Sequence, residues 1–414
     1  MLFVAGAFFS CKEEDPTAPV EAKAAPIIEA VRSMNPAKAD STFTQSTLGS
    51  TIVIKGQNLE NTTSITFNGY SASFNTAYAS ENYVIVTIPA ATPTVATATD
   101  VPNKLVVGNS KGEATYDFTV LPPAPIIETV SNEFAKAGEM ITLSGSYFYF
   151  VEEVIFPGNV VSKEFTASAD GNSLIVKVPS SVDPTNAENS ELIVRSQSGN
   201  SAVNQSIKFN DRTGILVDWD TKVTGKSDPL YSGWGISEDM SKVTDSYPGI
   251  SPVDGLYGLI DMAIAGNWSW ANAKLVNMSS NDANVNGGKL YPTAPSAMYD
   301  PEASIANFDL RAEIAATQPV GELILQVWQE HEGKKEYTAS VPLTNFVKTT
   351  DGKWYTISVN LGDLATDDGA TKFTGKYKDF IKPSDLRILI QNPSAVTVPT
   401  TMAIDNIRIV NITQ

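Results

Sequence analysis

Short runs of apolar and β-branched residues recur along the whole chain, and many of them are closed by Gly or Pro. Within the runs, apolar and polar positions tend to alternate, which is the period of a strand with one buried face. No long stretch follows the 3.6-residue period of a helix. Short strands separated by turns are typical of antiparallel sandwiches, so the pattern predicts an all-β protein.

One set of runs occurs twice in the same order. Residues 25–31, Ala-Pro-Ile-Ile-Glu-Ala-Val, return 99 positions later as residues 124–130, Ala-Pro-Ile-Ile-Glu-Thr-Val. The matched pairs that follow are residues 51–56 with 140–145, 65–69 with 154–158, 84–89 with 174–179, and 105–112 with 192–199. An ordered repeat of this kind indicates two copies of one domain.

The order of these runs resembles the IPT/TIG family of immunoglobulin-like domains. It consists of a Pro-Ile start, a strand ending in Gly, a Phe-x-Gly turn in the first copy with Phe-Pro-Gly in the second, an Ile-Val strand that ends at Pro, and a final hairpin. The resemblance implies two immunoglobulin-like β-sandwiches, over residues 24–121 and 122–209. Neither copy contains Trp or a metal-ligand spacing, so we expect both to be spacers, stiffened by the prolines at residues 122–125.

Residues 210–414 carry further strand-like runs, at residues 214–219, 307–314, 322–330, 354–361, 386–390 and 402–409. The late order of Phe-x-Leu, Leu-x-Leu-x-Val-Trp, Trp-Tyr-x-Ile-x-Val-x-Leu and a terminal Ile-Asp-Asn-Ile-Arg-Ile resembles jelly-roll carbohydrate-binding modules. The resemblance implies that the two smaller sandwiches are followed by a larger jelly-roll-like β-sandwich.

The amino-acid composition limits which partners the chain can bind and which metal or disulfide sites it can form. The chain has 29 Lys and Arg against 46 Asp and Glu, a formal net charge of −17, which disfavours nucleic acid as a partner. One cysteine, Cys11, and one histidine, His331, allow neither an intrachain disulfide nor a multi-histidine metal site. We expect no cofactor and no metal. Asp405 could ligate a structural calcium ion of the kind found in jelly rolls, but a polar residue at a strand end is the simpler interpretation.

The N-terminus resembles the end of a bacterial lipoprotein signal. Residues 1–10 form an apolar run, too short to span a membrane, that ends at Cys11. The basic segment of a complete signal is missing, so we expect the true start upstream. The resemblance implies lipidation of Cys11, followed by a flexible tether over residues 11–23. The acidic residues 13–15 resemble a tag for the outer face of the outer membrane, with a solvated charge run as the alternative.

Taken together, these segments resemble the surface glycan-binding protein B family of Sus-like glycan-uptake systems. The resemblance implies a lipid-anchored protein on the outer membrane, facing outward, that binds a polysaccharide beside a glycan importer. It also suggests a neutral β-glucan as the ligand.

All six tryptophans, Trp219, Trp234, Trp268, Trp270, Trp328 and Trp354, lie in the C-terminal region. An indole offers a flat apolar surface for the C–H face of a sugar, and neighbouring amides can bond its hydroxyls. Trp234 lies between glycines in a predicted loop, while Trp268, Trp270 and Asn272 project from one face if the segment is extended. We predict that these four residues bind the glycan, with Tyr231 and Tyr291 as supporting candidates. A satellite core beneath a long loop is the alternative.

Strand alternation sorts the remaining tryptophans. In residues 322–330, Leu323, Leu325 and Val327 make one face, and Gln326, Trp328 and Glu330 make the other. Gln326 and Trp328 are therefore candidate ligand contacts, although Ile324 on the same face keeps a buried interpretation open. Trp219 shares a face with Ile215 and Val217 and is predicted to be core, and Trp354 is assigned a structural role.

Two other functions, that of a glycoside hydrolase and that of an adhesin, compete with glycan binding. A glycoside hydrolase needs two carboxylates flanking the bond that is cleaved. The candidate acids are Asp218, Asp220 and Glu330, but the first two are expected on one solvent face and the third precedes a charged hairpin. An adhesin would use the exposed aromatic residues to bind a protein partner. We predict a protein that binds and does not catalyse.

Overall fold

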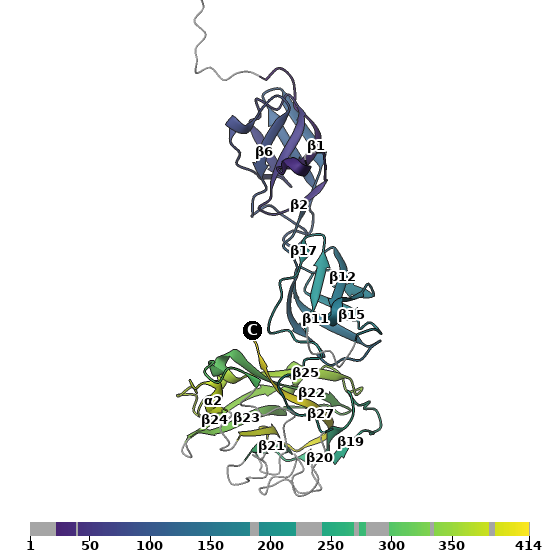
Figure 1. The fold of residues 1–414 in the computed structure, drawn as a ribbon, viewed down its shortest axis with the longest axis vertical. Helices are drawn as coiled ribbons and strands as arrows, with labels where there is room; N and C mark the ends of the chain where they lie inside the picture. Colours follow the sequence, from purple (N-terminus) through teal and green to yellow (C-terminus); the bar gives the residue numbers. More distant parts are fainter. Residues whose placement is uncertain are drawn as a thin grey trace, which may run out of the picture. The chain divides into compact units, whose positions relative to one another are not determined.

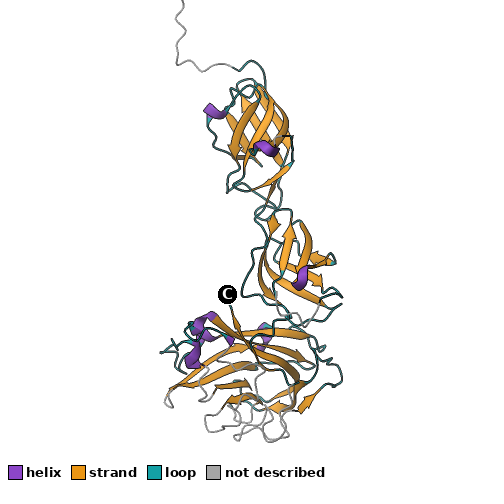
Figure 2. Ribbon diagram, viewed as in Figure 1, coloured by secondary structure: helices purple, strands orange, loops and turns teal. Residues whose placement is uncertain are grey.

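The computed structural model describes residues 22–413, except residues 39, 183–189, 221–241, 269–272, 279–297, 332–334 and 381–385. The chain folds as two compact units, Met1–Pro123 and Ala124–Gln414, and the second unit contains both the second repeat and the C-terminal domain. Strands dominate each domain, and the described helices are short (Figure 2). The all-β prediction is confirmed. Among the described residues, none of the helices is long and apolar enough to cross a membrane.

The first unit is an immunoglobulin-like sandwich (Figure 1). One sheet has the strand order β1-β3-β6, the other has the order β5-β4-β7-β8, and β2 pairs with β9 in parallel. The strands are β1 Ile27–Ser33, β2 Gln45–Thr47, β3 Thr51–Gln57, β4 Ser64–Phe67, β5 Tyr70–Ser71, β6 Tyr83–Thr87, β7 Lys104–Asn109, β8 Gly112–Asp117 and β9 Thr119–Leu121. Fully buried Ile54, Phe67 and Val107 are part of its core.

The second repeat forms a sandwich of the same kind. Its sheets have the strand orders β10-β11-β15-β14 and β13-β12-β16-β17. The strands are β10 Ile126–Val130, β11 Met140–Ser146, β12 Val151–Phe156, β13 Val160–Ser162, β14 Phe165–Ala167, β15 Ser173–Lys177, β16 Ile193–Ser196 and β17 Gly199–Asn200. Leu143, Leu174 and Val194 are fully buried between the two sheets.

The two repeats share one irregularity. In both, the register of the first strand pair shifts near its start. A Cβ on Gly56 would lie 1.8 Å from the Ile27 carbonyl oxygen, and a Cβ on Gly145 would lie 1.9 Å from that of Ile126. Only glycine allows the backbones to approach so closely, which gives the matched glycines of the repeat a physical reason.

The C-terminal domain packs a six-stranded sheet on a four-stranded sheet. The six-stranded sheet has the order β19-β20-β27-β22-β25, with β18 also pairing to β27, and the four-stranded sheet has the order β21-β26-β23-β24. The strands are β18 Ile215–Val217, β19 Lys242–Thr244, β20 Tyr257–Ile264, β21 Ala273–Met278, β22 Phe308–Ala316, β23 Ile324–His331, β24 Lys335–Pro342, β25 Trp354–Asn360, β26 Leu386–Gln391 and β27 Val398–Asn411, and the short helix α2 is Tyr377–Phe380.

One core fills the space between these two sheets. Leu323, Leu325 and Val327 are fully buried in it, as the alternation predicted. Trp219 is 2% exposed and Trp354 is 8% exposed, so Trp219 is core as predicted and Trp354 is also largely buried in the core.

The second domain is bonded to the outer face of the six-stranded sheet. The loop between β10 and β11 carries Glu133, whose backbone N–H donates to Thr356 Oγ1 at 2.8 Å, while the Thr356 N–H donates to the Ser131 carbonyl at 2.9 Å. The neighbouring Phe134 is buried in the core cluster of the C-terminal domain. The expectation of an inert spacer missed this contact.

Candidate functional site

The outward face of the four-stranded sheet is polar where its inward face is apolar. In β24, Tyr337 and Ala339 are buried toward the core. Glu336, Thr338 and Ser340 alternate with them, and all three are exposed or half-buried. Because alternate side chains of a strand point to opposite faces, these three residues lie on the outer surface.

The strand register arranges the outward side chains in rows. Trp328 of β23 pairs with Thr338 of β24 on one side and with Arg387 of β26 on the other. Gln326, two residues earlier in β23, pairs with Ser340 of β24. The rows bring an indole, two hydroxyls, an amide and a guanidinium group together on one surface.

A hollow of about 500 Å³ lies on this face. Its lining residues are Trp268, Gln326, Trp328, Glu336, Thr338, Ser340, Asp367 and Gln391. The lining combines two indole rings with amides, hydroxyls and two carboxylates. Such a mixture can hold a ligand that has both flat apolar faces and many hydroxyl groups.

Trp328 is held in place by the guanidinium group of Arg387. The Arg387 Cζ atom lies 4.3 Å from the centre of the indole ring. A cation over an aromatic face is attracted by the ring quadrupole, so this contact fixes the orientation of the ring and covers one of its faces. Trp328 is half-buried on the outward face beside Gln326, and it does not belong to the core.

Trp268 reaches the same hollow from a turn that follows β20. It is 51% exposed, and it and Asn267 both have left-handed backbone conformations, with φ of 54° and 58°. The Trp268 N–H donates to the carbonyl of Asn392, just after β26, at 3.1 Å. A large exposed ring tied to a fixed backbone is a suitable surface for a ligand.

Three of the predicted contacts, Trp268, Gln326 and Trp328, therefore line one hollow. Their role in binding stays a prediction. The other predicted site residues, Trp234, Trp270 and Asn272, lie outside the described residues, as do Tyr231, Tyr291 and the lipidation candidate Cys11.

The remaining lining residues were missed by the sequence analysis. Glu336, Thr338 and Ser340 carried a usable signal, because they alternate with apolar residues in β24. Asp367 and Gln391 carried none, since a loop and a strand end bring them to the hollow. Ala365 holds the Asp367 loop beside β24 through two backbone hydrogen bonds with Thr338, at 2.8 and 3.0 Å.

Of the acids considered for hydrolysis, the two whose side chains are described, Asp218 and Asp220, do not line this hollow. Asp220 is exposed and accepts a hydrogen bond from the Leu256 N–H at 2.6 Å, and partial desolvation raises the pKa of its carboxyl group. Asp218 is half-buried, and the side chain of Glu330 is outside the described part of the chain. The sequence predicted that Asp218 and Asp220 project to one solvent face, and the structure leaves Asp220 exposed and Asp218 half-buried.

Asp405 is not at a strand end. It lies inside β27, paired with Glu313 of β22, and is fully buried. The strand-end interpretation was wrong because β27 continues to Asn411, where β22 still pairs with it. Burial raises the pKa of the Asp405 carboxyl well above its usual range. Within the described ranges, no group of three His, Cys, Asp or Glu side chains could hold a metal ion.

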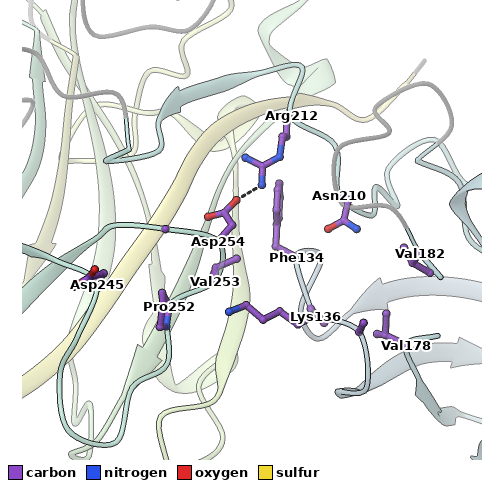
Figure 3. Close-up of a pocket in the computed structure, with 13 residues that line it drawn as sticks. Phe134, Lys136, Val178, Val182, Asn210, Arg212, Asp245, Pro252, Val253 and Asp254 are labelled. Carbon is purple, nitrogen blue, oxygen red and sulfur yellow. Dashed lines mark hydrogen bonds and ion pairs between the residues drawn. The ribbon is translucent and has the colours of Figure 1, made fainter. Parts of the chain in front are cut away.

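A larger hollow, of about 760 Å³, lies between the second domain and the C-terminal sandwich. Figure 3 shows the Arg212–Asp254 ion pair beside the ring of Phe134. Phe134 is only 4% exposed, and the Arg212 guanidinium lies 5.4 Å from the centre of its ring. Among the described residues that line it, this hollow therefore offers no exposed aromatic surface of the kind that Trp268 provides.

Two family models match the chain. The surface glycan-binding protein B xyloglucan binding domain matches residues 209–411, and the IPT/TIG domain matches residues 31–120. A curated IPT/TIG domain-containing protein of Bacteroides ovatus is 32% identical over 165 residues, which are 40% of this chain and 32% of that protein. The match thus spans about a third of the length of that relative.

Solved structures of surface glycan-binding proteins are also similar to this chain. A surface glycan-binding protein from Prevotella bryantii is 22% identical, with a TM-score of 0.59 over 95% of this chain and 100% of that chain. A surface glycan-binding protein B from a complex xyloglucan utilization locus in Bacteroides uniformis is 18% identical, with a TM-score of 0.47 over 94% and 99% of the two chains. At this level of identity, the Prevotella structure shows the shared fold.

Proposed function

We propose that this chain captures a neutral polysaccharide in the hollow on the four-stranded sheet, because residues 209–411 match the family model of the surface glycan-binding protein B xyloglucan binding domain. The observation that carries the proposal is the exposed Trp268 above a sheet face that also presents Trp328 and Gln326. The rings would stack on the C–H faces of sugar units, and the amides would bond the hydroxyls. The proposed role is to bind the polysaccharide without cleaving it.

The proposed ligand is a β-glucan. Its support is the description of the matching family, which names xyloglucan. Two exposed carboxylates, Glu336 and Asp367, line the hollow, and the chain has a net charge of −17. Like charges repel across a binding surface, so an acidic polysaccharide would bind more weakly than a neutral one.

The proposal includes a place on the cell surface, in keeping with the family name. Lipidation of Cys11 and a tether over residues 11–23 would hold the domains at the outer membrane, beside a glycan importer. Anchoring near the importer raises the effective concentration of captured glycan, so a modest affinity is sufficient.

The test is affinity electrophoresis of the chain from residue 24 onward against xyloglucan, mixed-linkage β-glucan and a polyuronate. We expect a neutral β-glucan to retard the protein, and Trp268→Ala to weaken binding roughly tenfold or more, as loss of a central aromatic contact does. Tyr78→Ala is the matched control, because Tyr78 is also an exposed ring, at 62%, but lies in the first domain.

The rival functions predict other results. Release of reducing ends from the glycan that binds would indicate a hydrolase. Failure of every glycan to retard the wild-type protein would contradict the proposal and favour an adhesin that recognises a protein partner.

A further inference from the structure

One buried side chain joins the segments on which the exposed Trp268 turn rests. Asn392 follows the last residue of β26 and is fully buried. Its amide nitrogen donates to the Ile264 carbonyl at 3.0 Å and to the Val396 carbonyl at 2.7 Å. Its amide oxygen accepts from the backbone N–H of Ser394 at 3.1 Å and from the Ser394 hydroxyl at 2.7 Å.

The segment organised by Asn392 in turn holds the tryptophan turn through the backbone. The Asn392 carbonyl accepts from the Trp268 N–H at 3.1 Å, and the Ser394 carbonyl accepts from the Asn267 N–H at 2.6 Å. Gly266 packs tightly on the same segment, since a Cβ there would lie 2.4 Å from the Ser394 carbonyl oxygen. Three consecutive residues of the turn, Gly266, Asn267 and Trp268, therefore contact the segment of residues 392–396.

This turn needs support because its backbone is unfavourable. Asn267 and Trp268 are consecutive non-glycine residues with φ of 58° and 54°. The left-handed region is strained for side chains as bulky as an indole, and such conformations persist where the surroundings determine them. Hydrogen bonds from Asn267 and Trp268 to residues 392–396 hold both residues in this conformation.

We propose that Asn392 is a positioning residue for glycan binding, acting through Trp268. Asn392 holds the loop of residues 392–396 in the shape that fixes the Trp268 ring at the hollow, while the adjacent Gln391 lines the hollow itself. This inference rests on the proposed function. Asparagine suits the position because one short side chain supplies both donors and an acceptor. Aspartate would place a carboxylate against the two carbonyl oxygens.

The test is a double-mutant cycle in the full chain from residue 24, with the β-glucan that retards the wild-type protein as the probe. We expect Asn392→Ala to weaken binding about as much as Trp268→Ala, roughly tenfold. In the Trp268→Ala background, Asn392→Ala should weaken binding less than about twofold further, because residues that act through one contact are not additive. Additive losses, or unchanged affinity in Asn392→Ala, would overturn the proposal.

The matched control is Asn360→Ala. Asn360 ends β25 in the opposite sheet, and its side chain likewise accepts from a turn N–H, that of Gly362 at 2.9 Å. We expect this variant to lower the thermal stability and leave glycan affinity unchanged. Equal losses of affinity in Asn360→Ala and Asn392→Ala would reduce the effect to general destabilisation and overturn the positioning role.

Two further measurements keep the inference testable if Asn392→Ala folds poorly or if no glycan binds. Gly266→Ala places a Cβ against the Ser394 carbonyl oxygen and so pushes the turn away from residues 392–396. It should weaken glycan binding as Trp268→Ala does. Hydrogen exchange of the Trp268 amide requires no ligand, and its protection should fall in Asn392→Ala and stay unchanged in Asn360→Ala. Retained protection in Asn392→Ala overturns the inference, whereas lost protection without glycan binding by the wild type contradicts only the proposed function.

Discussion

At the scale of single residues, the charge buried beneath the second domain is the least expected feature of the molecule. Glu313 is fully buried and accepts hydrogen bonds from Arg408 at 2.6 and 3.0 Å and from Thr356 at 2.9 Å. Removing a carboxylate from water is costly, and Glu133 adds a second negative charge nearby. Burial raises the pKa of Glu313 to about 7, and its bonds with Arg408 offset part of that effect.

The raised pKa predicts how stability depends on pH. Between pH 4.5, the ordinary value for glutamate, and about 7, the folded protein holds a proton on Glu313 that the unfolded chain has lost. The stabilisation that this bound proton supplies is therefore fully present below pH 4.5 and is lost as the pH rises through about 7. Relative to Glu313→Gln, which cannot titrate, the wild-type free energy of unfolding should fall by about 3 kcal/mol between pH 4.5 and 8.

Urea unfolding of both proteins across this range measures the difference. The buried Asp405 is present in both proteins, and its raised pKa is caused mainly by its own burial, with Glu313 as a smaller cause, so most of its contribution is common to the two profiles. Parallel pH profiles for the wild type and Glu313→Gln would contradict the prediction.

At the scale of elements, the close backbone approach at the glycine shared by the two repeats predicts a loss of stability that no side-chain contact would predict. Gly145→Ala places a Cβ 1.9 Å from the Ile126 carbonyl oxygen, where β10 and β11 meet. The strands must separate, so we expect a loss of about 2 to 4 kcal/mol in the free energy of unfolding. Ser144→Ala, at the preceding position of β11, should lose less than about 1 kcal/mol by the same denaturant titration. Similar losses in both variants would show that the close approach is not required.

The elements that the sequence predicted best are those with strong apolar alternation. β23 and β27 were expected within a few residues of their ends, because their apolar residues give a clear strand pattern. β24 was missed because it begins with Lys335 and Glu336, which look like part of a charged hairpin. Its polar face became meaningful only when pairing with β23 placed it beside Trp328.

The candidate site was likewise predictable only in part. Trp268, Gln326 and Trp328 could be selected from residue type and strand alternation. The contact between Arg387 and Trp328 depends on the register of two strands far apart in the sequence, and the role of Asn392 depends on bonds to Ile264. Local patterns carry no record of such pairings, which are set by the folding of the whole sandwich.

At the scale of the whole molecule, a cluster of charged side chains joins the second domain to the C-terminal sandwich within the second unit. Its members are Glu133, Asp309, Arg311, Glu313 and Arg408. Arg408 donates to Glu133 of the second domain at 2.6 Å and to Glu313 of the sandwich, and Arg311 is paired with Glu133 and Asp309. The side chains of Arg408 and Glu133 are 1% and 4% exposed. The sandwich thus buries two arginines whose shared carboxylate partner comes from the preceding domain.

This arrangement predicts that the second domain and the sandwich stabilise each other. Removing one member of a buried ion pair leaves uncompensated charge, so Glu133→Ala should lower the free energy of unfolding by about 3 to 5 kcal/mol. Glu128→Ala, an exposed glutamate of the same domain, should change it by less than about 0.5 kcal/mol.

Hydrogen exchange in the full chain separates this coupling from local damage. If the ion cluster links the domains, Glu133→Ala should lower the protection of β22 and β27 in the sandwich as well as that of β10 and β11. A loss confined to β10 and β11 would mean that the two domains fold independently despite their contact. In that case the second domain would be a spacer after all, and the four-stranded sheet that we propose to bind glycan, on the opposite side of the sandwich, would not depend on it.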